Sequence, residues 1–249
     1  KSGYPSGISD QFTKRRILTI FPFRNEEEII QSTLTRVIQE VKKDSNCKLI
    51  LVDSASSDNG AKLAKKILED SELEERDWNL ISLGRPGKGL ALNAGMAEIL
   101  HGDIVMMIDA DALVSKDSSR RMRKWLENED IGAVSAQEKI PPGSYLAEYK
   151  IRSNTLRNLE SSIGSTPILE GSQLAWDPFR IGWKSFDERT NADDLQVSLC
   201  SIRSGHRSVV DSKITYQDLR NTKNRDFFKF IRRSQGINKQ LCSNIDLIF

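Results

Sequence analysis

Two carboxylates, Asp109 and Asp111, stand directly after an unbroken apolar run, residues 104–108. Such a run is typical of a strand that is buried on both faces, as in a parallel sheet. In open α/β sheets, ligands bind beyond the carboxyl ends of the strands, and side chains two residues apart leave an extended chain on the same side. These acids therefore suit a hard divalent cation that carries a diphosphate. The alternative is a pair of solvated turn residues that end the strand.

Polar residues follow two earlier apolar runs in the same way. Residues 17–21 precede Pro22, which cannot donate to a sheet ladder, and residues 49–52 precede Asp53. After Pro22, we expect Asn25 to be the N-cap of a helix. The acids that follow Asn25 complement a helix dipole, and Ser and Asp after a strand often cap the next helix. Capping alone would therefore explain both turns.

A basic, glycine-rich loop at residues 84–89 contains Lys88 and leads into a predicted helix at 90–100. The N–H groups and the dipole of a helix N-terminus attract anions, so this loop could hold a phosphate. It is not a P-loop, because the glycine spacing differs and no Ser or Thr follows the lysine. An ordinary turn that binds no ligand could have the same basic, glycine-rich sequence.

The part of the chain before Asp109 alternates between strands and helices. Strands are expected at 17–21, 49–52, 78–82 and 104–108, with a helix between each pair. This order predicts a parallel sheet wound by right-handed crossovers. The G-x-G-x-x-G pattern is missing after the first strand, which disfavours a dinucleotide ligand.

The second half of the chain is less regular. Its predicted elements are helices at 119–126 and 144–163, and strands at 131–135, 209–210 and 214–216. Residues 164–175 predict a loop and a strand rich in small groups. The acidic pair Asp193 and Asp194 precedes a further helix, where acids complement the dipole.

The composition excludes several function classes. The 249 residues carry 37 Lys and Arg against 35 Asp and Glu, a net charge of +2 that predicts no nucleic-acid partner. Three scattered cysteines fit a reducing compartment and exclude a cysteine-built zinc site. No apolar run approaches the ~20 residues that span a bilayer, and no secretory signal is present. The chain begins at Lys1 rather than Met, which is compatible with a piece of a longer membrane protein.

In chain order, these stretches resemble the motifs of the family 2 glycosyltransferases. The matching segments are P-F-R-N-E-E at 22–27, V-D-S-A-S-S-D at 52–58, G-K-G-L-A-L-N-A-G at 87–95, D-A-D at 109–111, A-D-D at 192–194 and R-R-S-Q-G at 232–236. Three positions depart from the family pattern: Ser54 and Ala55 replace Asp and Gly, and Arg233 replaces Trp.

The resemblance implies an α/β protein of the GT-A fold, with a mostly parallel, Rossmann-like sheet flanked by helices and a smaller mixed sheet on the acceptor side. Within this one domain we expect a flexible tail at 1–13, a nucleotide-sugar-binding half at 14–115, an acceptor-binding and catalytic half at 116–219, and a C-terminal helical segment at 220–249. The implied enzyme is an inverting hexosyltransferase. It would transfer a sugar from a UDP- or GDP-sugar to a hydroxyl of a glycan or lipid-linked glycan, as in polysaccharide biosynthesis.

The resemblance implies the donor contacts as follows: Pro22, Glu26 and Asp53 around the base and ribose, Lys88 near the diphosphate or Asp53, and Asp109 at the ribose or at a metal-bound water. Carboxylates suit the first task because they accept hydrogen bonds from base N–H groups and ribose hydroxyls. Asp111, with Asp109 beside it, would bind Mn²⁺ or Mg²⁺, which acts as a Lewis acid on the leaving diphosphate.

On the acceptor side, the resemblance implies that Asp194 is the general base for the attacking hydroxyl, with Asp193 contacting substrate next to it. A base on the face opposite the leaving group predicts inversion. Arg232 would help to neutralise the leaving diphosphate. Without a catalytic role, the acidic pair would still suit a helix N-terminus.

Two further positions have open interpretations. Trp176 follows the segment in which relatives shape the acceptor site, so it could stack on a sugar or belong to the core. The family often supplies a late histidine to the metal, but none lies at 214–218. Gln217, Asp218 or water would take its place.

Two other functions compete with glycosyl transfer. A sugar-nucleotide nucleotidyltransferase would have a G-x-G-x-R loop after its first strand, where this chain has Pro22-Phe23-Arg24-Asn25. A non-catalytic nucleotide-sugar-binding protein would not need the intact Asp194.

The basic, phenylalanine-containing segment 223–233 would suit a lipid-linked acceptor at a membrane surface. This predicts a cytoplasmic location, with peripheral contact at the inner face of the membrane. Packing of these phenylalanines on the domain itself is the alternative.

Overall fold

The computed structural model describes residues 15–44, 46–140, 147–190, 192–220, 235–240, 242–244 and 246. In this part of the chain the strands are β1 (Ile17–Phe23), β2 (Cys47–Asp53), β3 (Trp78–Ser82), β4 (Ile104–Ile108), β5 (Ala112–Val114), β6 (Ile131–Glu138), β7 (Gln173–Trp176) and β8 (Arg207–Asp218). The α-helices are α1 (Ile30–Lys42), α2 (Gly60–Glu69), α3 (Lys88–Met96), α4 (Ser118–Leu126), α5 (Ala147–Ile163) and α6 (Asp193–Arg203), and Glu75–Asp77 forms a short 3₁₀ turn.

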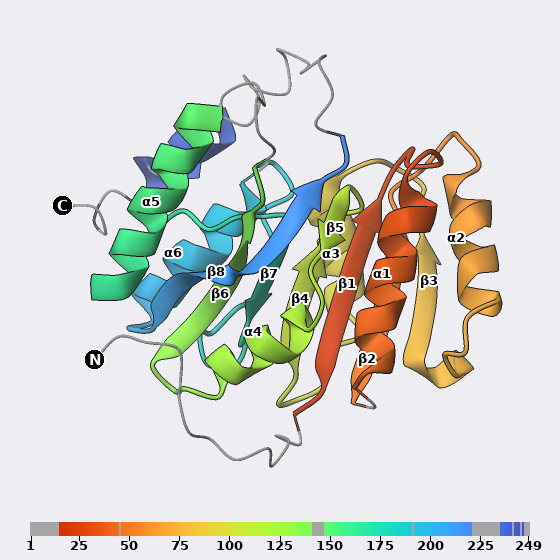
Figure 1. The fold of residues 1–249 in the computed structure, drawn as a ribbon, viewed down its shortest axis with the longest axis horizontal. Helices are drawn as coiled ribbons and strands as arrows, with labels where there is room; N and C mark the ends of the chain where they lie inside the picture. Colours follow the sequence, from red (N-terminus) through yellow and green to blue (C-terminus); the bar gives the residue numbers. More distant parts are fainter. Residues whose placement is uncertain are drawn as a thin grey trace.

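All eight of these strands belong to one sheet, in the order β3-β2-β1-β4-β7-β6-β8-β5 (Figure 1). The first four strands in this order run parallel, as the alternation predicts. The direction reverses at β7, which is antiparallel to both β4 and β6. β8 is parallel to β6 and antiparallel to β5. The mixed part expected on the acceptor side is therefore a continuation of the parallel sheet.

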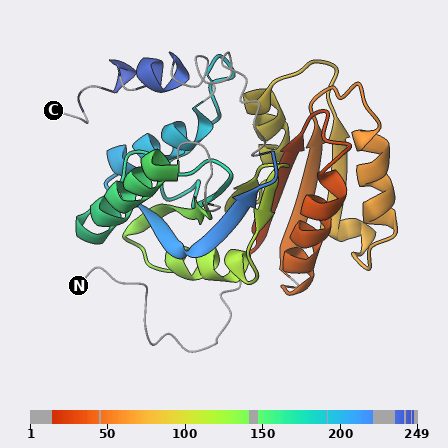
Figure 2. The same ribbon diagram turned by 45° about the horizontal axis from the view of Figure 1, so that its top comes forward.

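Helices cover both faces of the sheet because strand side chains alternate between the faces. In β1, Ile17 and Phe21 pack into a core with α1, α2 and α4, whereas Leu18 and Ile20 pack into a core with α3 and α6. Figure 1 shows α1 and α4 in front of the sheet and α3 behind it. Figure 2 shows α5 at the end of the molecule opposite α2. A site at the strand ends therefore lies between two helical layers.

The buried strands agree well with the predictions, and the later elements differ. The strands at 78–82 and 104–108 match β3 and β4, whereas α3 ends at Met96 rather than at residue 100. The strands predicted at 209–210 and 214–216 are parts of a single strand, β8, which also includes the polar residues 211–213. Asp211 is buried there, and its carboxylate accepts a hydrogen bond of 2.7 Å from Nε1 of Trp125 on α4.

Asn25 is not a helix N-cap, which corrects our expectation. It has φ 55°, in the left-handed region, and α1 begins only at Ile30. Its Oδ1 instead accepts a hydrogen bond of 2.8 Å from the amide of Ser57. The turn after β1 is thereby tied to the turn after β2.

Some predictions fall outside the described residues: the tail at 1–13, the start of the helix expected at 144–163, and the basic segment 223–233. In the described part of the chain, no helix combines the length and the apolar character needed to cross a membrane.

Candidate active site

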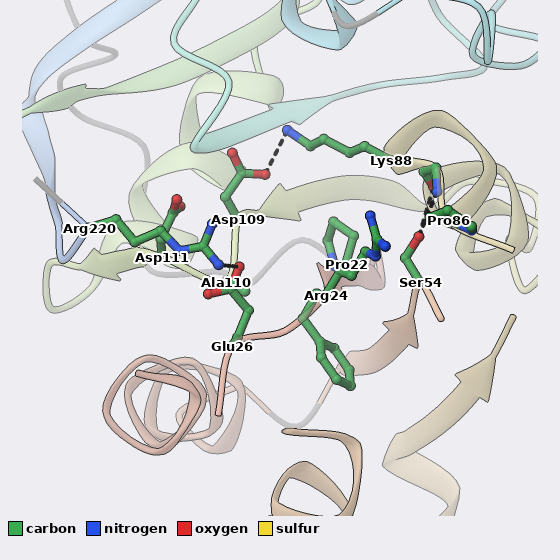
Figure 3. Close-up of a pocket in the computed structure, with 12 residues that line it drawn as sticks. Pro22, Arg24, Glu26, Ser54, Pro86, Lys88, Asp109, Ala110, Asp111 and Arg220 are labelled. Atoms are coloured by element: carbon green, nitrogen blue, oxygen red, sulfur yellow. Dashed lines mark hydrogen bonds and ion pairs between the residues drawn. The ribbon is translucent and has the colours of Figure 1, made fainter. Parts of the chain in front are cut away.

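A cavity of about 520 Å³ opens where β1 and β4 end (Figure 3). Its lining comprises Pro22, Phe23, Arg24, Glu26, Ser54, Pro86, Gly87, Lys88, Asp109, Ala110, Asp111 and Arg220. Five of the donor-side residues proposed from the sequence thus meet here: Pro22, Glu26, Lys88, Asp109 and Asp111.

The acids Asp109 and Asp111 are held at the end of β4. Every residue of β4 is buried, so the strand is fixed between the two cores. The amide of Asp109 donates to the carbonyl of Ser172 over 3.0 Å, and the amide of Leu219 donates to the carbonyl of Asp111 over 2.9 Å. The segments just before β7 and just after β8 therefore fix the backbone that carries the carboxylates.

Lys88 lies at the first position of α3 and forms two ion pairs. Its Nζ is 2.7 Å from Oδ1 of Asp109 and 2.8 Å from Oδ2 of Asp193. Burial alone would lower the pKa of Lys88, but the two carboxylates outweigh burial, and the pKa is raised. The ammonium therefore stays charged, and it contacts Asp109 and Asp193 rather than Asp53, one of the partners implied by the resemblance.

Negative charge is concentrated around Asp109. Burial raises the pKa of Asp109, Lys88 lowers it, and the carboxylates of Asp111 and Asp193 raise it further. The pKa of Asp218, two residues before Arg220, is also raised, first by burial and then by the charge of Asp111. A divalent cation at Asp109 and Asp111 would relieve this repulsion.

The donor set fits such a cation. In the described residues, no group of three or more His, Cys, Asp or Glu side chains forms a ready-made metal site. Mg²⁺ is usually bound through one or two carboxylates together with substrate phosphates and water. The pair Asp109 and Asp111, opening onto a cavity, matches that arrangement.

The turn after β2 is held by local and long-range hydrogen bonds. Oδ1 of Asp53 accepts from the amide of Ser56 over 3.0 Å, and Asp53 is buried. Oγ of Ser54 accepts from the amide of Gly87 over 2.8 Å, which connects β2 to the loop before α3. In this structure Asp53 thus holds a turn, and its contact with a nucleotide stays a prediction.

Arg220 is a lining residue that sequence analysis missed. It forms an ion pair with Oε1 of Glu26 (Figure 3). Its Nη2 also donates to the carbonyl of Asn25 over 3.4 Å. No spacing signal could have found this contact, because Arg220 and Asn25 are 195 residues apart in sequence. The ion pair joins the end of β8 to the loop after β1.

The adjacent acids at the start of α6 face different surroundings. Asp193 pairs with Lys88, which lines the larger cavity, whereas Asp194 lines a second cavity of about 240 Å³. Gly171 lies beside Asp194, and a Cβ atom at Gly171 would be 3.3 Å from Oδ2 of Asp194. Arg232, the other predicted catalytic residue, lies outside the described residues.

Of the two interpretations of Trp176 that the sequence left open, the structure agrees with a core residue and not with a ring exposed to a sugar. Its side chain is 0% exposed, in the central strand β7. The rings of Trp183 and Phe186 pack edge-on against it, with centroids 6.0 Å and 5.9 Å away. The sheet and these rings cover the indole, so no ligand reaches it.

The profile of the family described as Glycosyl transferase family 2 matches residues 19–215. The match covers most of the sequence, so the chain belongs to glycosyltransferase family 2. Poly-beta-1,6-N-acetyl-D-glucosamine synthase of Staphylococcus aureus is 33% identical to it over 118 residues. These residues make up 47% of this chain and 27% of that protein, so the chain matches about a quarter of the length of this relative.

Two solved structures have the same architecture. The mannosyltransferase PcManGT from Pyrobaculum calidifontis, in complex with GDP-Man and Mn²⁺, has a TM-score of 0.77 at 25% identity, over 93% of this chain and 64% of that one. Glucosyl-3-phosphoglycerate synthase from Mycobacterium tuberculosis, in complex with Mn²⁺, UDP and phosphoglyceric acid, has a TM-score of 0.66 at 20% identity, over 92% and 78%. The expected GT-A glycosyltransferase fold is therefore confirmed.

Proposed function

We propose that this chain transfers a sugar, with inversion, from a nucleoside diphosphate sugar in the larger cavity to a hydroxyl group in the smaller one. The observation that carries this proposal is the position of the acidic pair between the cavities. Asp193 shares Lys88 with Asp109, and Asp194 lines the smaller cavity. A donor and an acceptor bound on the two sides would meet at the start of α6.

On the donor side, Asp111 and Asp109 would hold Mn²⁺ or Mg²⁺ together with oxygens of the diphosphate. When bound, the ion supplies Lewis-acid stabilisation of the leaving group. Pro22 and Glu26 would contact the base and ribose, in which case Glu26 exchanges part of its ion pair with Arg220 for the nucleotide. Lys88 would keep Asp109 and Asp193 in place and add positive charge beside the diphosphate.

On the acceptor side, Asp194 would take the proton of the attacking hydroxyl. The acceptor oxygen then forms a bond to the anomeric carbon, and the bond from that carbon to the diphosphate oxygen breaks. The electron pair leaves with the diphosphate. Because attack and departure occur on opposite faces, the anomeric configuration inverts. A carboxylate is a competent base when it lies within hydrogen-bond reach of the hydroxyl.

The acceptor is proposed to be a glycan, free or lipid-linked. The name of the staphylococcal relative supports a glycan product, because it denotes a synthase of a β-1,6-linked polysaccharide. Mn²⁺ in both solved neighbours supports a divalent ion in the donor site.

One assay separates this function from its competitors. The protein is incubated with Mn²⁺ and a panel of UDP-, GDP- and dTDP-sugars, and release of nucleoside diphosphate is followed with and without glycan acceptors. A glycosyltransferase releases nucleoside diphosphate faster with an acceptor present. A nucleotidyltransferase would exchange pyrophosphate, and a pure binder would bind nucleotide and release nothing; either result would refute the proposal.

A further inference from the structure

We propose that the outward face of α5 docks on the surface of an anionic lipid bilayer, with its apolar side chains at the boundary between headgroups and acyl chains. Such docking does not depend on the proposed function, although it would favour the lipid-linked acceptor over the free one. Three features of the chain support it: the distribution of side chains around α5, the position of Arg152, and the composition of the segment that follows β8.

Most of the large apolar side chains that are exposed in the described part of the chain belong to α5, which lies at the edge of the molecule (Figure 2). The exposed side chains of this kind are Leu100, Tyr149, Ile151, Leu156, Leu159, Ile163 and Phe179. Tyr149, Leu156 and Ile163 are spaced seven residues apart, so they share one face of the helix. Leu159 lies one turn before Ile163 on the same face. These four side chains form an apolar stripe roughly 20 Å long.

The opposite face of α5, which packs on the protein, is polar. It carries Lys150, Asn154, Arg157 and Ser161, and the buried residues of the helix are Asn154 and Ser161. Arg157 forms an ion pair with Glu170, and Oγ of Ser161 accepts a hydrogen bond of 2.9 Å from the amide of Val210 on β8. A helix on a surface that faces water has the reverse polarity, with its apolar stripe toward the core. The outward face of α5 therefore suits a surrounding other than water.

Arg152 favours a bilayer over a protein as that surrounding. It lies within the stripe, between Tyr149 and Leu156, and its side chain is 83% exposed. Its ion pair with Glu148, at 3.7 Å, is also exposed and adds little stability. A protein partner that covered the stripe would have to bury the guanidinium, which is costly. At a bilayer, the apolar stem of the arginine can lie along the stripe while the guanidinium reaches the lipid phosphates.

The segment that follows β8 adds positive charge beside this face. Asp218, at the end of β8, lines the smaller cavity together with Tyr149. Shortly afterwards the chain enters segment 221–234, which lies outside the described residues. In sequence, this segment combines Lys223, Arg225, Lys229, Arg232 and Arg233 with Phe227, Phe228 and Phe230, and its one acid is Asp226. Basic clusters of this kind are attracted to anionic lipids. The stripe and the segment thus favour the same kind of surface.

Tyr149 connects the stripe to the smaller cavity, because it belongs to both. Tyrosine, with an apolar ring and a polar hydroxyl, is common at the boundary between a membrane and water. A bilayer on the stripe would therefore bring its headgroups to the rim of this cavity. Under the proposed function, a lipid-linked glycan could then reach the acceptor site without leaving the membrane.

Flotation with lipid vesicles tests the docking on the intact chain. The vesicles contain phosphatidylcholine alone or mixed with phosphatidylglycerol, and binding is measured at low and at high salt. The chain should bind the mixed vesicles at low salt and keep part of this binding at high salt. Salt screens the attraction between the basic segment and the lipids, but it does not weaken the burial of apolar side chains.

Variants locate the docking to α5. Leu156→Gln and Leu159→Gln should each weaken the binding at high salt by roughly fivefold, since a leucine at the interface gains part of the free energy of full burial. Leu100→Gln is the matched control, because Leu100 lies outside α5 and is 59% exposed, against 57% for Leu156. Arg152→Gln should weaken binding to the mixed vesicles more than binding to phosphatidylcholine alone. Thermal unfolding checks that each variant is folded.

Absence of binding to both kinds of vesicle would overturn the proposal, as would equal losses for Leu100→Gln and Leu156→Gln. Light scattering without vesicles tests a second copy as the occupant. A dimer that Leu156→Gln dissociates would make the stripe an interface between two copies, and the proposal would be wrong.

Nucleotide binding with Mn²⁺, measured on the same samples, keeps the proposed function separate. If UDP, GDP and dTDP do not bind, the proposed function fails, whatever the vesicles show. If nucleotide binds and the vesicles do not, only the docking proposal fails. Leu156→Gln should leave nucleotide binding unchanged, because Leu156 does not line the larger cavity.

Discussion

The Nζ atom of Lys88 lies 2.7 Å from Oδ1 of Asp109, so the first residue of α3 is joined to the end of β4. The same ammonium lies 2.8 Å from Oδ2 of Asp193 at the start of α6. Three elements that are distant in sequence therefore meet at one cation. Without the ammonium group of Lys88, the carboxylates of Asp109 and Asp193 would repel each other beside the proposed metal site.

We expect Lys88→Gln to shift the pH dependence of nucleotide binding. Lys88 lowers the pKa of Asp109, so its loss raises that pKa further above the usual carboxylate range. A proton then competes with Mn²⁺ up to a higher pH, and the midpoint of Mn²⁺-dependent UDP or GDP binding moves upward. Calorimetry at subsaturating Mn²⁺ over roughly pH 5 to 9 measures this midpoint. The control is Lys62→Gln, on an exposed face of α2; an unchanged or lower midpoint would contradict the expectation.

Asp111→Ala should remove the metal dependence of nucleotide binding. The variant lacks the carboxylate that we propose as the metal ligand, so UDP or GDP should bind equally weakly with Mn²⁺ and with EDTA. Calorimetric titration of nucleotide into both forms measures the effect. Asp70→Ala, at the exposed C-terminus of α2, is the matched control. A variant that still binds nucleotide more tightly with Mn²⁺ would exclude Asp111 as the metal ligand.

Asp194→Asn should lower kcat by ~10²–10⁴-fold, the usual contribution of a positioned acid or base. The affinity for nucleotide should hardly change, because Asp194 lines the smaller cavity. The amide can still accept the hydrogen bond that Oδ1 of Asp194 receives from Leu195 over 2.9 Å. Steady-state kinetics and nucleotide titration separate the two effects. Turnover at the normal rate would show that another group takes the proton.

Trp176→Ala should destabilise the fold by ~3–5 kcal/mol, as expected for a large aromatic side chain removed from a core. Trp176→Phe should cost less, because it leaves a smaller gap between Trp183 and Phe186. Urea unfolding measures both, with Leu156→Ala, on an exposed face of α5, as the control. A Trp176→Ala variant with normal stability but a raised KM for acceptor would instead point to sugar binding.

The parts of the fold that depend on local apolar runs could be predicted from the sequence. Strands such as β4 are buried on both faces, so their pattern is set by their own residues. Asn25 was mispredicted because its partner, the amide of Ser57, is 32 residues away. The middle of β8 was missed for the same reason, since Asp211 is satisfied by Trp125 on another element.

In the candidate site, too, features set by local sequence could be predicted, whereas contacts between distant segments could not. The acids after β4 could be found because a strand end and a two-residue spacing determine where they point. The contacts of Arg220 and Glu170 could not, because their partners come from other elements. Tyr216, which donates to Glu170, is 46 residues away from it in sequence.

The continuity of the sheet has a consequence for how such a chain can diversify. The α5 helix packs on β8, whereas α3 packs on β1 and β2 near the other end of the sheet. Under the proposed function, substitutions in α5 can alter acceptor binding in the smaller cavity, while the strands beside the proposed nucleotide site keep their register. Such a scaffold would allow α5 to change in evolution without a matching change in the parallel strands beside the larger cavity.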